Sequence, residues 1–234
     1  MGTNTAEMGV KIRTFRPSDT RRIRNVLIEG LYSNIDPAFF VGVRRPSVIG
    51  AVVAWTAFMY YWTLSLLSAI TVFVALLFIY YNSLLIAAYF LTKGPLFDDV
   101  QDVQRNYMKP RRNFWVAEAD NGQVVGTIAI TLKSLDKPAN ERADDVAWLR
   151  RMAVSENYRR QGIAKRLVET AIRFCRRNKY RRIELITTEV QLPAKALYEK
   201  MGFRCVNTWA RRQYGFVLWT FTLVYDMQQD STYH

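Results

Sequence analysis

The sequence has few of the residues that build several common kinds of site. Its 234 residues include two cysteines, Cys175 and Cys205, and one histidine, His234, which is the last residue. Two cysteines exclude the disulfide framework of small secreted domains and suit a reducing compartment. A lone terminal histidine leaves no basis for a histidine triad or a histidine metal cluster, so we expect no metal site.

Charge is also absent from one long stretch. Residues 46–92 contain no Asp, Glu, Lys, Arg or His, so all 33 basic and all 20 acidic residues lie in the rest of the chain. A stretch that is apolar on every face is typical of lipid-facing sequence, and one crossing takes about 20 residues. This stretch therefore predicts a membrane hairpin with two legs. The alternative is a helical pair buried inside a soluble protein.

The bend of this hairpin lacks a Gly or Pro to mark it. Its polar residues are Thr63, Ser65, Ser68 and Thr71. The Tyr-Tyr-Trp cluster at 60–62 is typical of the headgroup layer and would make the first leg short and re-entrant. Basic residues at 44–45 and 93 flank the stretch, which indicates that both flanks face the cytosol. The first 45 residues are polar and basic, so we expect no signal peptide.

Outside this stretch, hydrophobic periodicity predicts a mixture of strands and helices. The predicted strands cover 10–15, 114–119, 123–132, 146–154, 182–188, 203–210 and 216–225. The predicted helices run from an N-cap at 18–19 to 32, from 162 to 178 and from 194 to 201, and a polar loop covers 133–145. This order indicates an α+β or mixed three-layer domain. Cys175 falls on the buried face of a predicted helix and Cys205 on a predicted strand, and we expect both to pack rather than react.

The loop between the strand 146–154 and the helix 162–178 is the most informative segment. Gly162 and Ala164 are small enough to let a ligand approach the backbone, and the first amides of a helix attract an anion. Basic residues surround these amides at Arg159, Arg160, Lys165 and Arg166. Pyrophosphate fits such a loop, and the alternative is a merely solvated basic face. Neither the P-loop nor the Gly-x-Gly-x-x-Gly pattern is present.

Two motifs resemble the GNAT N-acetyltransferase superfamily. Arg159-x-x-Gly162-x-Ala164 after Met152-Ala153-Val154 resembles its coenzyme A motif, although many members have Gly where Ala164 stands. The run from Ala196 to Phe203 resembles its fourth helix. The camello-type branch is indicated by Tyr107-Met108-Lys109-Pro110, Phe114-Trp115-Val116-Ala117, the run 160–165 and the hydrophobic insertion. That membrane-bound branch includes aspartate and cysteine-S-conjugate N-acetyltransferases.

The resemblance implies a domain that the membrane hairpin interrupts. Residues 1–45 would supply its first strand and helix, residues 46–92 the hairpin, and residues 93–234 the remainder with the acetyl-CoA site. The expected fold is α+β, with a mixed, mostly antiparallel sheet flanked by helices and an inserted transmembrane or re-entrant hairpin. Both flanks then lie on one side of the membrane. We expect the cytosolic face of an internal membrane such as the endoplasmic reticulum.

The resemblance also implies roles for single residues. Main-chain groups of Met152 and Val154 would pair with the pantetheine arm of acetyl-CoA, and an amide near Val154 would hold the oxyanion. Tyr198 matches a tyrosine that protonates the departing thiolate, unless its ring merely packs on the sheet. Amides of the loop would hold the pyrophosphate: Arg160, Gln161, Gly162, Ile163, Ala164 and Lys165, with Arg159 before them.

The general base and the acceptor are less constrained. Glu118 and Glu189, at strand ends, are candidate bases, and a water chain is the alternative. Arg150 and Arg151 alternate faces on their strand, so one of them would enter the cleft and clamp a carboxylate. A small amino acid with an anionic or lipophilic side chain fits this expectation.

Positive charge is concentrated at 150–182, which holds twelve basic and two acidic residues. Coenzyme A and an anionic membrane leaflet both explain it, and the absence of stacking motifs argues against nucleic acid. The sequence therefore predicts a membrane-bound, acetyl-CoA-dependent N-acetyltransferase of small amino acids. The alternatives are acetylation of protein lysines or N-termini at the membrane, and a catalytically silent fold that acts as a membrane interaction module.

Overall fold

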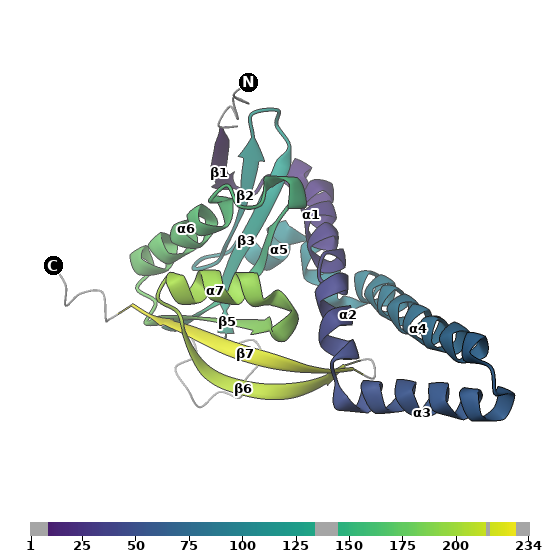
Figure 1. Cartoon of the computed structure of the whole chain (residues 1–234). Coiled ribbons are helices and arrows are strands. Elements are labelled where there is room, and N and C mark those ends of the chain that lie inside the picture. Colours follow the sequence, from purple (N-terminus) through teal and green to yellow (C-terminus); the bar gives the residue numbers. More distant parts are fainter. Residues whose placement is uncertain (1–8, 134–144, 214–215, 228–234) are drawn as a thin grey trace, which may run out of the picture.

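The protein is built on one seven-stranded sheet with helices on both faces (Figure 1). The computed structural model describes residues 9–133, 145–213 and 216–227. The strand order is β1-β2-β3-β4-β5-β7-β6, and the β4–β5 pair is parallel whereas the other pairs are antiparallel. The strands are β1 (Val10–Thr14), β2 (Asn113–Ala119), β3 (Val124–Leu132), β4 (Val146–Val154), β5 (Arg182–Thr188), β6 (Arg204–Gln213) and β7 (Phe216–Asp226).

Helices cover the two faces through two separate apolar clusters. The α6 and α7 face buries Leu167, Val168 and Ala171 against the middle strands, because these residues recur at helical spacing. The other face buries Ile23 of α1 and Val103 of α5. The helices are α1 (Thr20–Tyr32), α2 (Ile35–Val43), α3 (Pro46–Thr63), α4 (Leu66–Lys93), α5 (Val103–Tyr107), α6 (Ile163–Arg177) and α7 (Leu192–Lys200), with short 3-10 turns η1 (Pro17–Asp19), η2 (Pro95–Val100), η5 (Glu156–Tyr158) and η6 (Glu189–Gln191). The α+β prediction is confirmed.

The start of α1 differs from the prediction. Asp19 occupies the N-cap position, but its carboxylate does not cap α1. It instead accepts hydrogen bonds from Arg13 at 2.6 Å and from the Arg16 amide at 2.8 Å. The short elements α2, η2 and α5 were not predicted. Most of the predicted loop at 133–145 lies outside the described residues.

Strands β4 and β5 pair only at their beginnings. The pairs are Val146 with Arg182, Ala147 with Ile183, and Trp148 with Glu184. Both strands continue past this point, to Val154 and Thr188, so they diverge into a fork. Backbone groups on the facing edges of the fork have no ladder partner in the described sheet, which leaves them available to a ligand.

A β-bulge bends β4 at this fork. Thr127 lies opposite Ala153 and Ala129 opposite Arg150, so two residues of β4 face one of β3. Arg151, one of the extra pair, has a left-handed φ of 55°. The Thr127 hydroxyl donates to the Arg151 carbonyl at 2.7 Å and holds this conformation.

The uncharged stretch forms the two helices α3 and α4, which project from the sheet domain (Figure 1). Leu64, with φ of 50°, and Ser65 make the turn, and the Ser65 hydroxyl accepts the amide of Ser68 at 3.4 Å. The predicted polar turn therefore closes without Gly or Pro. Tyr61 and Trp62 at its tip are 80% and 76% exposed.

Among the described residues, two helical stretches are long and apolar enough to cross a membrane, residues 17–43 and 66–93. The first includes α1, which buries Ile23 and Val26 against the sheet and so belongs to the core of the domain. The second is α4, whose 28 residues extend about 42 Å. With 18 residues, α3 is shorter and extends about 27 Å.

Gly42→Ala is expected to loosen the contact between α2 and α4. A Cβ at Gly42 would lie 1.7 Å from the hydroxyl oxygen of Tyr80, so Tyr80 would have to leave its place beside Phe39. Overpacking of this kind costs about 1–3 kcal/mol. Gly50→Ala is the matched control, because a Cβ there meets nothing within 4 Å. Thermal unfolding in detergent should show a lower Tm for Gly42→Ala alone, and equal Tm values would contradict the packing described.

Candidate active site

The loop before α6 has the geometry of an anion site. Gly162 is the N-cap of α6 with φ of 75°, and no side chain caps the helix. The amides of the first turn therefore have no partner within the helix and carry the positive end of its dipole. A Cβ placed on Gly162 would meet nothing within 4 Å, so the backbone is open to a ligand.

The basic residues of the loop divide into two groups. Arg160 is exposed and the Lys165 side chain is 64% exposed, so both are available to an anion. Arg159 is also exposed, but its guanidinium already donates to the carbonyl of Val154 at 3.1 Å and to the hydroxyl of Ser33 at 2.8 Å. Arg159 thus links the end of β4 to the end of α1, and its direct contact with the ligand stays a prediction.

The remaining predicted loop residues offer mainly backbone. Ile163 is buried in the core, so its amide rather than its side chain is available. Ala164 is partly buried against the same cluster. Gln161 is exposed, and its side-chain Nε2 donates to the carbonyl of Asn157 at 3.4 Å, which leaves its backbone amide out of this bond.

The fork joins this loop to the sheet. Met152 and Val154 lie on the arm of β4 that has left β5, and their side chains pack into the cluster under α6 and α7. Their backbone groups on the β5 side lie beyond the last β4–β5 pair. An extended thioester arm can add to this edge like a strand, and its pyrophosphate end then reaches the start of α6.

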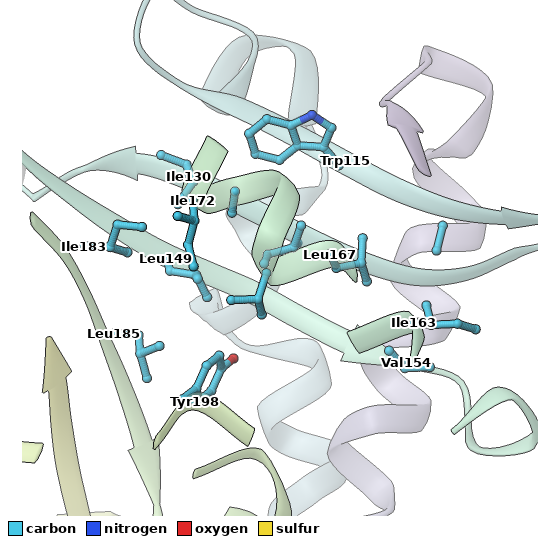
Figure 2. Close-up of a cluster of buried hydrophobic side chains, with 14 of the residues drawn as sticks. Trp115, Ile130, Leu149, Val154, Ile163, Leu167, Ile172, Ile183, Leu185 and Tyr198 are labelled. Atoms are coloured by element: carbon cyan, nitrogen blue, oxygen red, sulfur yellow. The ribbon is translucent and has the colours of Figure 1, made fainter. Parts of the chain in front are cut away.

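Tyr198 of α7 lies beside the fork. Its ring is 5% exposed and packs on Phe203, with ring centroids 5.5 Å apart. Figure 2 shows the ring next to Leu185 of β5, in the same cluster as Val154. Within the part of the chain that the structure describes, its hydroxyl has no hydrogen-bond partner. Burial raises the pKa of Tyr198, so the hydroxyl stays protonated and can donate.

Glu118 lies on β2, which β3 separates from the fork strand β4. Its carboxylate accepts two hydrogen bonds from Arg13, from Nε at 2.6 Å and from Nη2 at 3.1 Å, and pairs across the β1–β2 edge. The Arg13 hydrogen bond lowers the pKa of Glu118. Glu118 is therefore engaged in a structural ion pair: Arg13 of β1 binds both Glu118 of β2 and Asp19.

Glu189 lies just beyond the end of β5, but its carboxylate is engaged. It forms an ion pair with Arg45, the last residue before α3, and accepts the amide of Trp219 at 2.8 Å. Arg45 also donates to the carbonyl of Val217 at 3.0 Å. Glu189 thus ties the base of the hairpin to β5 and β7, which is a positioning arrangement rather than that of a base.

Glu189→Gln is expected to lower kcat/KM less than about tenfold and to leave the acid limb of the pH–rate profile in place, whereas loss of a base costs about 10²–10⁴. The amide keeps an acceptor for Trp219 but loses the charge that pairs with Arg45. Steady-state rates from pH 5.5 to 9 measure this. A collapse of kcat together with loss of the acid limb would restore Glu189 as the base.

Arg150 and Arg151 do not alternate faces, because the bulge interrupts the alternation. Arg150 pairs with Ala129, which lies in the cluster under α1, and Arg151 points to the same side. Arg151 pairs with Asp99 of η2 through two nitrogen atoms and so holds η2 on the sheet. The half-buried side chain of Arg150 has no hydrogen-bond or ion-pair partner among the residues described. Of the two arginines, Arg150 is therefore the remaining candidate for a carboxylate clamp.

Two contacts that position the site were missed in the sequence. Asp99 anchors Arg151, and Glu29 of α1 accepts from the hydroxyl of Ser155 at 2.9 Å and from the amide of Glu156 at 2.6 Å. These partners are separated by 52 and about 126 residues, so no local pattern indicates them.

The cysteines are placed differently from one another. Cys175 is buried in the core, and burial raises the pKa of its thiol, which excludes a nucleophile at neutral pH. Cys205 was expected to be packed, but it is exposed on the edge strand β6. Its thiol donates to the carbonyl of Asn207 at 3.7 Å.

Comparison with known proteins agrees with this geometry. The sequence profile of the acetyltransferase (GNAT) family matches residues 80–203. N-acetylaspartate synthetase of Danio rerio is 35% identical over 202 residues, which cover 85% of this chain and 68% of that protein. N-acetyltransferase family 8 member 3 of Rattus norvegicus is 32% identical over 82% of this chain and 83% of its own length. Probable N-acetyltransferase camello of Xenopus tropicalis is 32% identical, with coverages of 83% and 86%.

Solved structures show the same fold at low sequence identity. Ribosomal-protein-alanine N-acetyltransferase of Brucella melitensis superposes with a TM-score of 0.57 over 93% of this chain and 99% of that chain, at 15% identity. The family match and the length of the aligned relatives carry the assignment, and the shared fold agrees with it. The chain therefore belongs to the GNAT family of acetyltransferases, in its camello-type branch, and is an N-acetyltransferase.

Proposed function

We propose that this N-acetyltransferase is membrane-bound and transfers the acetyl group of acetyl-CoA to the amine of a small amino acid. The observation that carries the proposal is the β4–β5 fork, with the open start of α6 at its end and the unpartnered Tyr198 hydroxyl beside it. The relatives named for N-acetylaspartate synthesis support an acidic amino acid as one acceptor. GNAT enzymes use acetyl-CoA as co-substrate.

The residues at the fork divide the reaction among them. The amides from Arg160 to Lys165 hold the pyrophosphate, and the edges of Met152 and Val154 hold the pantetheine arm. The amine nitrogen attacks the thioester carbon, the C–N bond forms, and an amide near Val154 stabilises the oxyanion. The C–S bond then breaks, Tyr198 donates its proton to the thiolate, and water returns a proton to the Tyr198 phenolate. With Glu118 and Glu189 engaged by arginines, we assign the amine proton to water.

The membrane part of the proposal rests on α3 and α4. Their apolar side chains are widely exposed, among them Trp55, Phe58, Leu67, Phe78 and Ile79, each at 51% or more. Exposed apolar surface of this extent needs a lipid or protein cover. We place residues 46–92 in the bilayer of an internal membrane such as the endoplasmic reticulum, as an insertion between residues 1–45 and 93–234, with the domain in the cytosol.

Arg150→Gln is expected to raise the KM for a carboxylate acceptor about tenfold to hundredfold, because a charge-assisted hydrogen bond contributes about 1.5–3 kcal/mol. The KM for acetyl-CoA should not change. An amine without a carboxylate serves as the internal control, since it cannot use Arg150. An equal KM for both kinds of acceptor in wild type and variant would remove Arg150 from the acceptor site.

The whole proposal is tested by thiol release from acetyl-CoA. Detergent-solubilised protein is assayed with aspartate, with S-substituted cysteines and with a lysine peptide. We expect release with the free amino acids. Release with the peptide alone would favour the protein-acetylation alternative. If no acceptor causes thiol release and acetyl-CoA does not bind, the fold is catalytically silent.

A further inference from the structure

Exposed apolar side chains are not confined to the hairpin. Outside residues 32–96, the described part of the chain exposes five large ones: Ile186, Leu192, Val206, Val217 and Trp219. All five belong to β5, the start of α7, β6 and β7. None lies on β1 to β4 or on α6 in the residues described. Such exposure at one end of a domain is typical of a contact surface.

The pairing of β6 with β7 places part of this exposed apolar surface beside arginine side chains. Arg212 pairs with Val217 and Ala210 pairs with Trp219, so these four residues share one face of the β6–β7 ribbon. Arg211 follows on the other face. Both arginines are exposed, and neither has an ion-pair partner among the described residues. Val217 and Trp219 are 39% and 43% exposed. We call Arg212, Val217 and Trp219, together with the neighbouring Arg211 on the opposite face of the edge strand β6, the ribbon patch.

The ribbon patch lies next to the base of the hairpin. Figure 1 shows the turn end of β6 and β7 beside the junction of α2 and α3. Arg45 links the two directly, because it precedes α3 and donates to the carbonyl of Val217 at 3.0 Å. Arg44 beside it is exposed as well. The patch is thus continuous with the segment that we place at the entrance to the bilayer.

We infer that the ribbon patch is a second membrane contact, which sits in the headgroup layer of an anionic leaflet. This inference rests on the proposed membrane hairpin and extends it to the catalytic domain. Trp219 and Val217 enter the interface, where indole rings are favoured. Arg211 and Arg212 bind lipid phosphates, which guanidinium groups match in two-point geometry. The two contacts fix the tilt of the domain, and the fork then faces the membrane at a constant angle.

Depth measurements on the full chain test this inference. Val217→Cys, in a Cys205→Ser background, carries a nitroxide label in nanodiscs of phosphatidylcholine with phosphatidylserine. Buried Cys175 is shielded from the label. The label at 217 should be accessible to oxygen and protected from a water-soluble nickel complex. Arg173→Cys on the exposed face of α6 is the control for water, and Ile79→Cys on α4 is the control for lipid.

The three positions separate the possible failures. If the label at 79 lies in lipid but the label at 217 matches the label at 173, the ribbon patch is wrong and the hairpin stands. If the label at 79 also lies in water, the membrane proposal itself fails. Arg211→Gln with Arg212→Gln should abolish the protection at 217 that phosphatidylserine adds over phosphatidylcholine alone, and unchanged protection would overturn the anionic contact.

Native Trp219 gives a second reading that needs no label. Brominated lipids should quench a larger fraction of the tryptophan fluorescence in the wild type than in Trp219→Phe, because the variant lacks the indole ring at the interface. Equal quenching of the two proteins would contradict the inference even if the cysteine variants fold poorly.

Discussion

Gly162→Asp is expected to abolish binding of acetyl-CoA, with an affinity loss of about two orders of magnitude or more. A carboxylate there would stand beside the first amides of α6, where the pyrophosphate is held. Like charges about 4 Å apart repel by about 4 kcal/mol at an effective dielectric constant of 20. The left-handed φ of 75° adds strain for any residue with a Cβ. Isothermal titration with acetyl-CoA measures the loss.

Gly122→Asp is the matched control for this variant. Gly122 has the same φ of 75° and the same open space around a Cβ, but it lies in the turn between β2 and β3. The strain is therefore shared and the anion site is not. Gly162→Asn adds a second comparison, because asparagine tolerates this backbone without adding charge. If Gly162→Asp and Gly122→Asp bind acetyl-CoA equally well, the loop has been misassigned.

Tyr198→Phe is expected to lower kcat by about 10²–10⁴ while leaving the KM for acetyl-CoA and the Tm nearly unchanged. The hydroxyl makes no hydrogen bond with the described residues, so its removal breaks no contact, and the ring still packs on Phe203. Because burial raises the pKa of Tyr198, the hydroxyl is protonated at neutral and mildly alkaline pH. The loss should therefore be similar across that range.

Single-turnover rates from pH 6 to 9 distinguish this role from a structural one. Tyr158→Phe is the control, since Tyr158 is another buried tyrosine of the same cluster but lies in η5 before the loop. It should turn over like the wild type. A Tyr198→Phe enzyme with wild-type kcat would remove Tyr198 from the reaction, and a fall in Tm would indicate a packing role instead.

Most of the fold followed from short-range patterns. Alternation along β4 and β5 and the apolar face of α6 are local properties, so these elements were predicted to within a few residues. The elements that were missed, α2, η2 and α5, are short and stabilised by distant partners. Asp99, for example, is held by Arg151 on β4.

The parts of the candidate site that are built from backbone groups could be predicted from the sequence. The parts that depend on side-chain contacts could be predicted less well. Gly162 and the start of α6 follow from composition and helix geometry alone. The roles of the carboxylates could not be predicted in this way. Glu118 and Glu189 look equally available in the sequence, but each forms an ion pair with an arginine far away along the chain. The bulge in β4 is also a property of the pairing between β3 and β4, so the sequence of β4 alone does not reveal it.

The pairing of β1 with β2 sets an order for biogenesis. Val10 pairs with Ala119, so the partner of the first strand emerges from the ribosome only after α3 and α4 have been made. If the hairpin enters the membrane as we propose, β1 must wait without its partner strand until the chain has returned from the bilayer. Closing so long a loop is slow and entropically costly. A hairpin that inserts with the wrong number of crossings would leave β1 on the opposite side of the bilayer from its sheet, and the enzyme would never assemble.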